Sequence, residues 1–150
     1  MAMIPETAER VEQNTAPALN RKVQVEIADS VRWHSTHPER IGSRLEELDR
    51  EWDIERTLEA NAATLAFSGA VLAATVDRKW LALPAIVTGF LLQHAVQGWC
   101  PPLPVLRRMG FRTAREIEME RTALKALRGD FAEVDKAADR PAAALASARR

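Results

Sequence analysis

The chain alternates between segments rich in charged residues and segments without any. Charge is absent from residues 60–76 and again from 80–106, whereas the three residues between them, 77–79, are all charged. A helical run of 17 residues is about 25 Å long, and the 20 residues 80–99 reach about 30 Å, which matches the hydrocarbon core of a bilayer. We therefore expect two apolar helices, joined by a short charged loop, to form an antiparallel hairpin within residues 60–106.

Amphipathic helices are expected on both sides of this hairpin. In residues 39–59, large apolar side chains recur at steps of four, three and four, which places them on one helix face. They are Ile41, Leu45, Leu48 and Trp52. Because neither Gly nor Pro follows them before the apolar run, this helix is expected to lead directly into the hairpin.

A second amphipathic helix is predicted within residues 107–131. Thr113 and Glu116 have the spacing of a capping box, which indicates a helix start at Thr113. Gly129 and Asp130 mark its end. Its apolar stripe consists of Ile117, Leu124, Leu127 and Phe131.

The two ends of the chain show no sustained apolar period. Residues 1–38 contain three prolines and many polar side chains, which indicates a mostly flexible arm. The alternation in residues 23–27 is typical of a short strand, but a lone strand has nothing to pair with. Residues 132–150 are Ala-rich and read as a frayed tail. The expected fold class is all-α: a two-helix transmembrane hairpin flanked by amphipathic cytoplasmic helices.

Two interpretations of the apolar runs are open. A soluble helical bundle would bury both runs beneath the helices at 39–59 and 113–131. A membrane hairpin is favoured because 20 successive uncharged residues are unusual in a soluble helix, and because two such runs flank a very short charged loop.

The distribution of Lys and Arg predicts how the hairpin would be oriented. Two basic residues, Arg78 and Lys79, lie in the loop, whereas eight arginines lie near the outer ends of the two runs. By the positive-inside rule, both termini then face the cytoplasm. Trp80 and Trp99, at opposite ends of the second run, suit the two bilayer interfaces.

Small residues suggest how the apolar helices associate. Four alanines recur at every fourth position of the first run, and an alanine and a glycine have the same spacing in the second. They are Ala62, Ala66, Ala70 and Ala74, with Ala85 and Gly89. Such stripes allow close helix packing, either within the hairpin or with a second copy, although alanine is also simply a good helix former.

Composition excludes several function classes. With 21 basic and 21 acidic residues the net charge is zero, so general electrostatic binding of nucleic acid is not expected. A single cysteine excludes an intramolecular disulfide and a cysteine-based zinc site. His34 and His37 have helical spacing but no cysteine nearby, so no metal and no cofactor is predicted.

The candidate chemistry lies at the end of the second run. Cys100 is the only thiol, and Arg107 and Arg108 follow it closely. A structural thiol is the simplest interpretation; a persulfide carrier, a palmitoylation site and an intermolecular disulfide are the alternatives. Polar residues inside a membrane span are functional candidates by default, although helix–helix hydrogen bonding explains them equally simply near an interface. These residues are Gln93, His94 and Gln97.

The segment 88–113, TGFLLQHAVQGWCPPLPVLRRMGFRT, resembles the end of the small YgaP-like transmembrane domains. In that family an apolar helix ends in a Gly-x-Cys-Pro element, followed by a short apolar turn and a glycine. The matching residues are Gly98, Cys100, Pro101, Leu106 and Gly110. The resemblance implies a bacterial inner-membrane protein that spans the membrane twice and self-associates. Within that family, the domain is sometimes fused to a sulfur-transferring rhodanese domain.

The first functional hypothesis is therefore a non-enzymatic inner-membrane protein that self-associates or docks a partner protein through its cytoplasmic helices. The alternative is a sulfur-handling accessory, in which Cys100 carries or receives sulfane sulfur from a rhodanese-like partner. A transport path along His94 and Gln97 would need an oligomer, because two helices cannot enclose a pore.

Overall fold

A computed structural model describes residues 9–148, and every regular element within that range is helical. This agrees with the expected all-α class. The chain forms two compact units, which are described separately. Unit 1 comprises residues 1–23 and 52–115, and unit 2 comprises residues 24–51 and 116–150.

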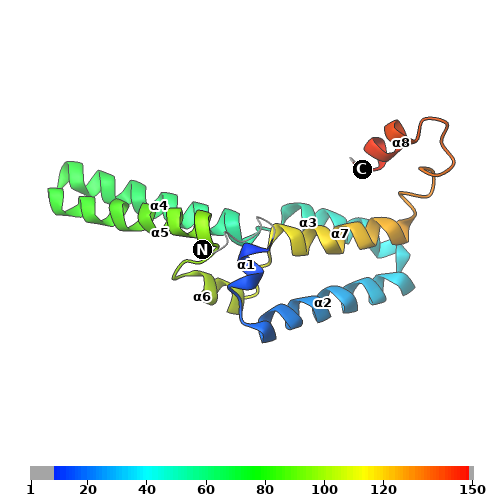
Figure 1. The fold of residues 1–150 in the computed structure, drawn as a ribbon, viewed down its shortest axis with the longest axis horizontal. Helices are drawn as coiled ribbons and strands as arrows, with labels where there is room; N and C mark the ends of the chain where they lie inside the picture. The colour runs from blue at the N-terminus through cyan, green and yellow to red at the C-terminus, as the bar shows by residue number, and fades with distance from the viewer. Residues whose placement is uncertain (1–8, 149–150) are drawn as a thin grey trace, which may run out of the picture. The chain divides into compact units, whose positions relative to one another are not determined.

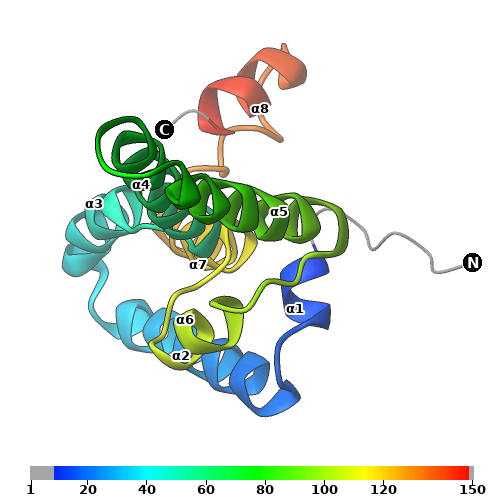
Figure 2. The same ribbon diagram turned by 90° about the vertical axis from the view of Figure 1, so that its left-hand side faces the viewer.

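Unit 1 is built around a long helical hairpin. Helices α4 and α5 run side by side and are joined at one end by the short helix η2 (Figures 1 and 2). Two shorter helices, α1 and α6, lie at the opposite end of the hairpin. The bounds are α1 (Arg10–Gln13), α4 (Ile54–Thr75), η2 (Arg78–Leu81), α5 (Ala82–Gln97) and α6 (Leu103–Arg108).

The charged loop of the hairpin makes its own cap. Asp77 precedes η2, and its carboxylate accepts a hydrogen bond of 2.8 Å from the backbone N–H of Lys79. This bond satisfies one of the backbone donors that a helix start leaves unpaired. Asp77 therefore caps the start of η2, which connects the end of α4 to the start of α5.

The two helices approach most closely at Gly69. A Cβ atom at this position would lie 2.6 Å from Pro84 Cδ and 3.1 Å from Leu83 Cβ, so only glycine fits without a shift. Beyond Asn61, the less exposed positions of α4 recur at steps of three and four, as expected for a helix that packs along one face. They are Ala62, Ala66, Gly69, Leu72 and Ala73.

Only part of the small-residue stripe singled out in the sequence lies between α4 and α5. Ala62 and Ala66 are half-buried, but the later alanines of α4 and the pair on α5 are exposed. A strict four-residue repeat drifts around a helix of 3.6 residues per turn, so it leaves the contact line after two turns. The exposed members are Ala70, Ala74, Ala85 and Gly89.

The helix predicted over residues 39–59 is in fact two helices. Helix α3 (Ile41–Arg50) ends before Glu51, and α4 starts at Ile54. Asp53 separates them, because its side chain accepts a hydrogen bond of 2.7 Å from the Arg56 backbone N–H and so caps α4. Trp52, expected on the buried face of a continuous helix, is instead 46% exposed.

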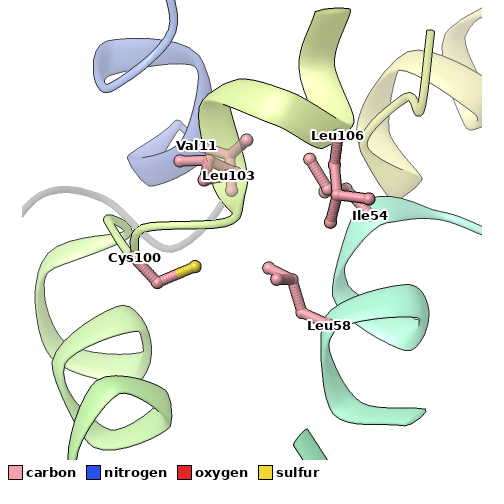
Figure 3. Packing of buried hydrophobic residues seen from close by; sticks show 6 residues of the cluster. All are labelled: Val11, Ile54, Leu58, Cys100, Leu103 and Leu106. Carbon is pink, nitrogen blue, oxygen red and sulfur yellow. The ribbon is translucent and has the colours of Figure 1, made fainter. Parts of the chain in front are cut away.

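A small apolar core closes the base of the hairpin. Figure 3 shows its buried side chains, which come from α1, α4, α6 and the segment after α5. They are Val11, Ile54, Leu58, Cys100, Leu103 and Leu106, with Phe111 packed against them. An ion pair of 2.6 Å between Arg10 and Glu55 joins α1 to α4 beside this core.

Gly98 fixes where α1 meets the hairpin. It ends α5 in the left-handed conformation with φ of 74°, and its backbone N–H donates to the His94 carbonyl at 2.7 Å. A Cβ atom here would lie 2.5 Å from the Arg10 carbonyl oxygen. Both the backbone angle and the close approach therefore require glycine.

Unit 2 has a separate core made by α3, α7 (Ala114–Arg128) and the later part of α2 (Pro17–Thr36). Glu120 of α7 is fully buried; its carboxylate accepts hydrogen bonds from Arg44 Nε at 2.9 Å and from Ser30 Oγ at 2.6 Å. The core residues are Ile41, Leu45, Leu48, Ile117 and Leu124, with Val31 packed against them. The remaining elements of this unit are η1 (Pro38–Arg40) and α8 (Arg140–Ala148).

The prediction of a mostly flexible arm differs from the structure. Residues 17–36 form the 20-residue helix α2, and the segment 23–27, considered as a strand, lies inside it. Val23, Ile27 and His34 are buried, and their spacing is that of one helix face. The alternation of apolar and polar residues in 23–27 hid this helical period in the sequence. Residues 1–8 of the arm lie outside the described range.

The second amphipathic helix agrees with its predicted bounds. Helix α7 begins directly after Thr113 and ends directly before Gly129, which has a positive φ of 88°. Of its stripe, Leu124 is fully buried but Leu127 is 44% exposed. The tail contains α8 where fraying was expected; residues 149–150 lie outside the described range.

Among residues 9–148, one helix is long and apolar enough to cross a membrane by length and composition, namely Arg78–Gln97, and 6% of it is buried. Helix α4 is less apolar because it contains Glu55, Arg56, Glu59 and Asn61. Large apolar side chains on both helices are exposed. They include Phe67 at 72%, Leu92 at 66% and Ile86 at 57%. That the hairpin crosses a membrane twice therefore stays a prediction.

We expect Gly98→Ala to destabilise unit 1 by about 2 kcal/mol or more, because it adds a steric clash to left-handed strain. Gly110 also has a positive φ, of 96°, but no atom lies within 4 Å of an added Cβ, so Gly110→Ala should cost only about 1 kcal/mol. Gly89→Ala, inside a helix and without neighbours, should be neutral or stabilising. Thermal unfolding followed by circular dichroism compares the three variants, and equal losses at Gly98 and Gly110 would contradict the close contact.

Candidate functional site

A cavity of about 360 Å³ lies in unit 1, where the base of the hairpin meets the segment that follows α5. Helices α4 and α5 supply most of its wall, and the proline-rich segment and α6 supply the rest. Its apolar lining consists of Leu58, Ala62, Leu65, Val87, Phe90, Leu91, Pro101, Pro102 and Leu106. The other lining residues are Asn61, His94 and Cys100, so none of the described residues that line it carries a fixed charge.

His94 is the most unusual side chain of this cavity. It is only 5% exposed, and among the described residues neither Nδ1 nor Nε2 has a hydrogen-bond partner. Its position is set by the last full turn of α5, whose end is fixed by Gly98. A buried polar group without a partner loses the hydrogen bonds it would make to water, so the site is chemically incomplete as it stands.

The other polar residues predicted in this region play smaller parts. Gln93 is half-buried and Gln97 is exposed. The Gln97 backbone carbonyl accepts a hydrogen bond of 2.9 Å from Asn14 Nδ2, which ties the end of α5 to the residue after α1. The structure thus separates His94 from the two glutamines with which the sequence grouped it.

Cys100 faces the interior of unit 1. Its side chain is 3% exposed, and Figure 3 shows its sulfur directed toward Leu58. Burial raises the pKa of the Cys100 thiol above its ordinary value, and the backbone N–H of Leu103 opposes this only in part. Since the thiolate is the nucleophile, these conditions favour a neutral packing thiol over a reactive one.

Arginine does not activate this thiol. Arg107, which follows Cys100 closely in the sequence, is itself buried. Its guanidinium donates to the Asn20 side-chain oxygen at 3.0 Å and to the Phe111 carbonyl at 3.1 Å. It therefore holds α6 to the start of α2 within unit 1. Arg108 is exposed at the end of α6.

The histidines considered as metal ligands belong to unit 2. His34 Nδ1 lies 2.8 Å from the Ser30 carbonyl, and the His37 ring stacks on Trp33 with 4.2 Å between ring centroids. Among the described residues, no group of three His, Cys, Asp or Glu side chains could hold a metal ion.

The sequence singled out His94 and Cys100 but did not predict the cavity that both residues line. His94 and Cys100 are six positions apart, and nothing local shows that Gly98 folds the chain back so that both line one space. Asn61 and the apolar residues of α4 were read as a plain span. Pro102, at the position before α6, was the available signal for that unpredicted helix, since proline favours helix starts.

Comparison with known proteins returned no relative. No protein-family model, no curated protein and no solved structure matches the chain. The site is therefore interpreted from its own geometry.

We expect the alkylation of Cys100 by iodoacetamide to show a raised pH midpoint in the folded protein. The raised pKa leaves less thiolate at any given pH, so the rate should reach half of its maximum at a higher pH than in the chain denatured in urea. A folded midpoint below the denatured one would contradict a buried neutral thiol and would favour the sulfur-handling alternative.

Proposed function

We propose that this chain is a small bacterial inner-membrane protein whose α4–α5 hairpin spans the bilayer twice. The observation that carries the proposal is the exposed apolar surface of the hairpin, including Phe67, Ile86 and Leu92. The helix of a soluble core would bury such side chains, whereas lipid covers them without a partner. Trp80 is 42% exposed near the start of Arg78–Gln97, and Trp99 is 37% exposed two residues beyond its end; both suit the two interfaces.

The soluble-bundle interpretation has less support. It needs the amphipathic helices to cover the apolar pair, yet α3 and α7 bury their apolar faces in the core of unit 2. The side chains that would have to be covered on α4 and α5 remain exposed. A membrane is the simpler solvent for this surface.

Within the membrane, the chain acts as a structural or interaction component and not as an enzyme. Exposed small residues on α4 and α5, namely Ala70, Ala74, Ala85 and Gly89, suit association with a second copy because they permit close backbone approach in lipid. Unit 2, placed in the cytoplasm by the Lys/Arg distribution, supplies a helical surface for a partner protein. The resemblance to the YgaP-like domains points in the same direction.

Membranes from expressing cells, washed with alkaline carbonate, test location and association together. The chain should stay in the pellet, and Gly89→Cys on a Cys100→Ser background should form a disulfide-linked dimer on mild oxidation. Val87→Cys is the matched control, because it lines the cavity on the half-buried side of α5 and should cross-link far less.

Recovery in the carbonate supernatant would contradict membrane insertion. A chain that pellets, but whose Gly89→Cys and Val87→Cys variants cross-link equally, would keep the membrane location and remove self-association through this face.

A further inference from the structure

Neither ring nitrogen of His94 has a hydrogen-bond partner among the described residues of unit 1. Arg10 and Glu55 both act electrostatically on His94; Arg10 Nη2 binds Glu55 Oε1 at 2.6 Å, while Arg10 Nε has no hydrogen-bond partner among the described residues. Asn61, the side-chain amide that lines the cavity, donates a hydrogen bond from its Nδ2 to the Thr57 carbonyl at 2.9 Å. The Cys100 thiol is a weak donor and a weak acceptor. Both ring nitrogens therefore remain available to whatever occupies the cavity.

The cavity is partly open to solvent, so water can enter it. Its walls are mostly apolar, and they offer few hydrogen-bond partners besides His94, Asn61 and Cys100. An apolar molecule with one hydrogen-bonding group can contact the apolar walls and also hydrogen-bond to His94. The volume of about 360 Å³ lies within the range typical of small-molecule sites.

The lining also defines the charge of the occupant. None of the described side chains facing the cavity is an acid, a lysine or an arginine. A charged ligand would lose its hydration without gaining an opposite charge, which is strongly unfavourable. The ligand that fits is therefore neutral.

We propose that the cavity binds a neutral, lipid-like molecule carrying a carbonyl or hydroxyl group, which hydrogen-bonds to His94. An alkyl-substituted quinone has this chemistry: a ring carbonyl accepts from an imidazole N–H, and the methyl groups and tail fill the apolar wall. A long-chain alcohol offers the same shared chemistry with a smaller head. The assignment goes beyond the structural role proposed above and does not depend on the location of the chain in the cell.

Cys100 is a built-in reporter for this site, because the only thiol of the chain lines the cavity. The experiment measures the rate at which N-ethylmaleimide alkylates Cys100 in the full chain, in detergent, with added decylubiquinone. The quinone ring is fully substituted and so does not add to the thiol, which an unchanged protein mass verifies. 1-Decanol and decane, at equal mole fractions, are the comparison probes.

Saturating decylubiquinone should slow alkylation at least tenfold, whereas decane should slow it less than twofold. Protection by 1-decanol as well would extend the site to neutral lipid heads in general, and its absence would restrict the site to a quinone-sized ring. Equal protection by decane and decylubiquinone, or no protection by either polar probe, would overturn the proposal.

His94→Phe keeps a flat ring but removes both nitrogens. It should raise the half-maximal decylubiquinone concentration about tenfold, equivalent to about 1.4 kcal/mol. His94→Gln, which keeps a donor and an acceptor, should stay within about threefold of the original protein, and Gln97→Leu, at an exposed site one turn on, should not change it. An unchanged value for His94→Phe would overturn the role of His94. If that variant does not fold, the comparison of decylubiquinone with decane on the original chain still decides.

Discussion

Exposed hydrocarbon on the α4–α5 hairpin is the constraint on which the rest of the structure depends. Each large apolar side chain left in water costs on the order of 1.5–3 kcal/mol relative to burial, and both helices carry several of them. The hairpin cannot remove this surface by packing against itself, because its two helices bury only one line of contact each. We propose that the bilayer covers the remainder.

The base of the hairpin is, by contrast, tightly specified. Gly98 admits the backbone of α1, Asp53 starts α4, and the ion pair between Arg10 and Glu55 joins the two helices. These contacts hold the end of α5 against the proline-rich segment and leave a defined cavity between them. The contacts that close the base of the hairpin therefore also bury His94, whose ring nitrogens have no hydrogen-bond partner among the described residues.

The sequence predicted the all-α class, the apolar runs and the bounds of α7, because charge depletion and capping residues are local signals. It did not reveal α2, since a five-residue alternation around Val25 obscured a helical period that extends to His34. It offered the alanine repeat for packing either within the hairpin or with a second copy, and it did not single out Gly69, which lies against Pro84 and Leu83 of α5. The cavity was beyond sequence reasoning, because it depends on how Gly98 returns the chain toward α1 and α4. The sequence singled out residues such as His94, but it did not show the cavity that surrounds them.

Topology is the most direct test of the claim that the hairpin crosses a membrane. Cysteines replace Arg78 in the loop of the hairpin and Ser43 or Thr122 in unit 2, all at exposed positions, on a Cys100→Ser background. In intact spheroplasts a membrane-impermeant maleimide should label the cysteine at position 78, and it should label positions 43 and 122 only after lysis. Protection of position 78 together with the other two until lysis would contradict a membrane-spanning hairpin, and labelling of 43 and 122 with protection of 78 would reverse its orientation.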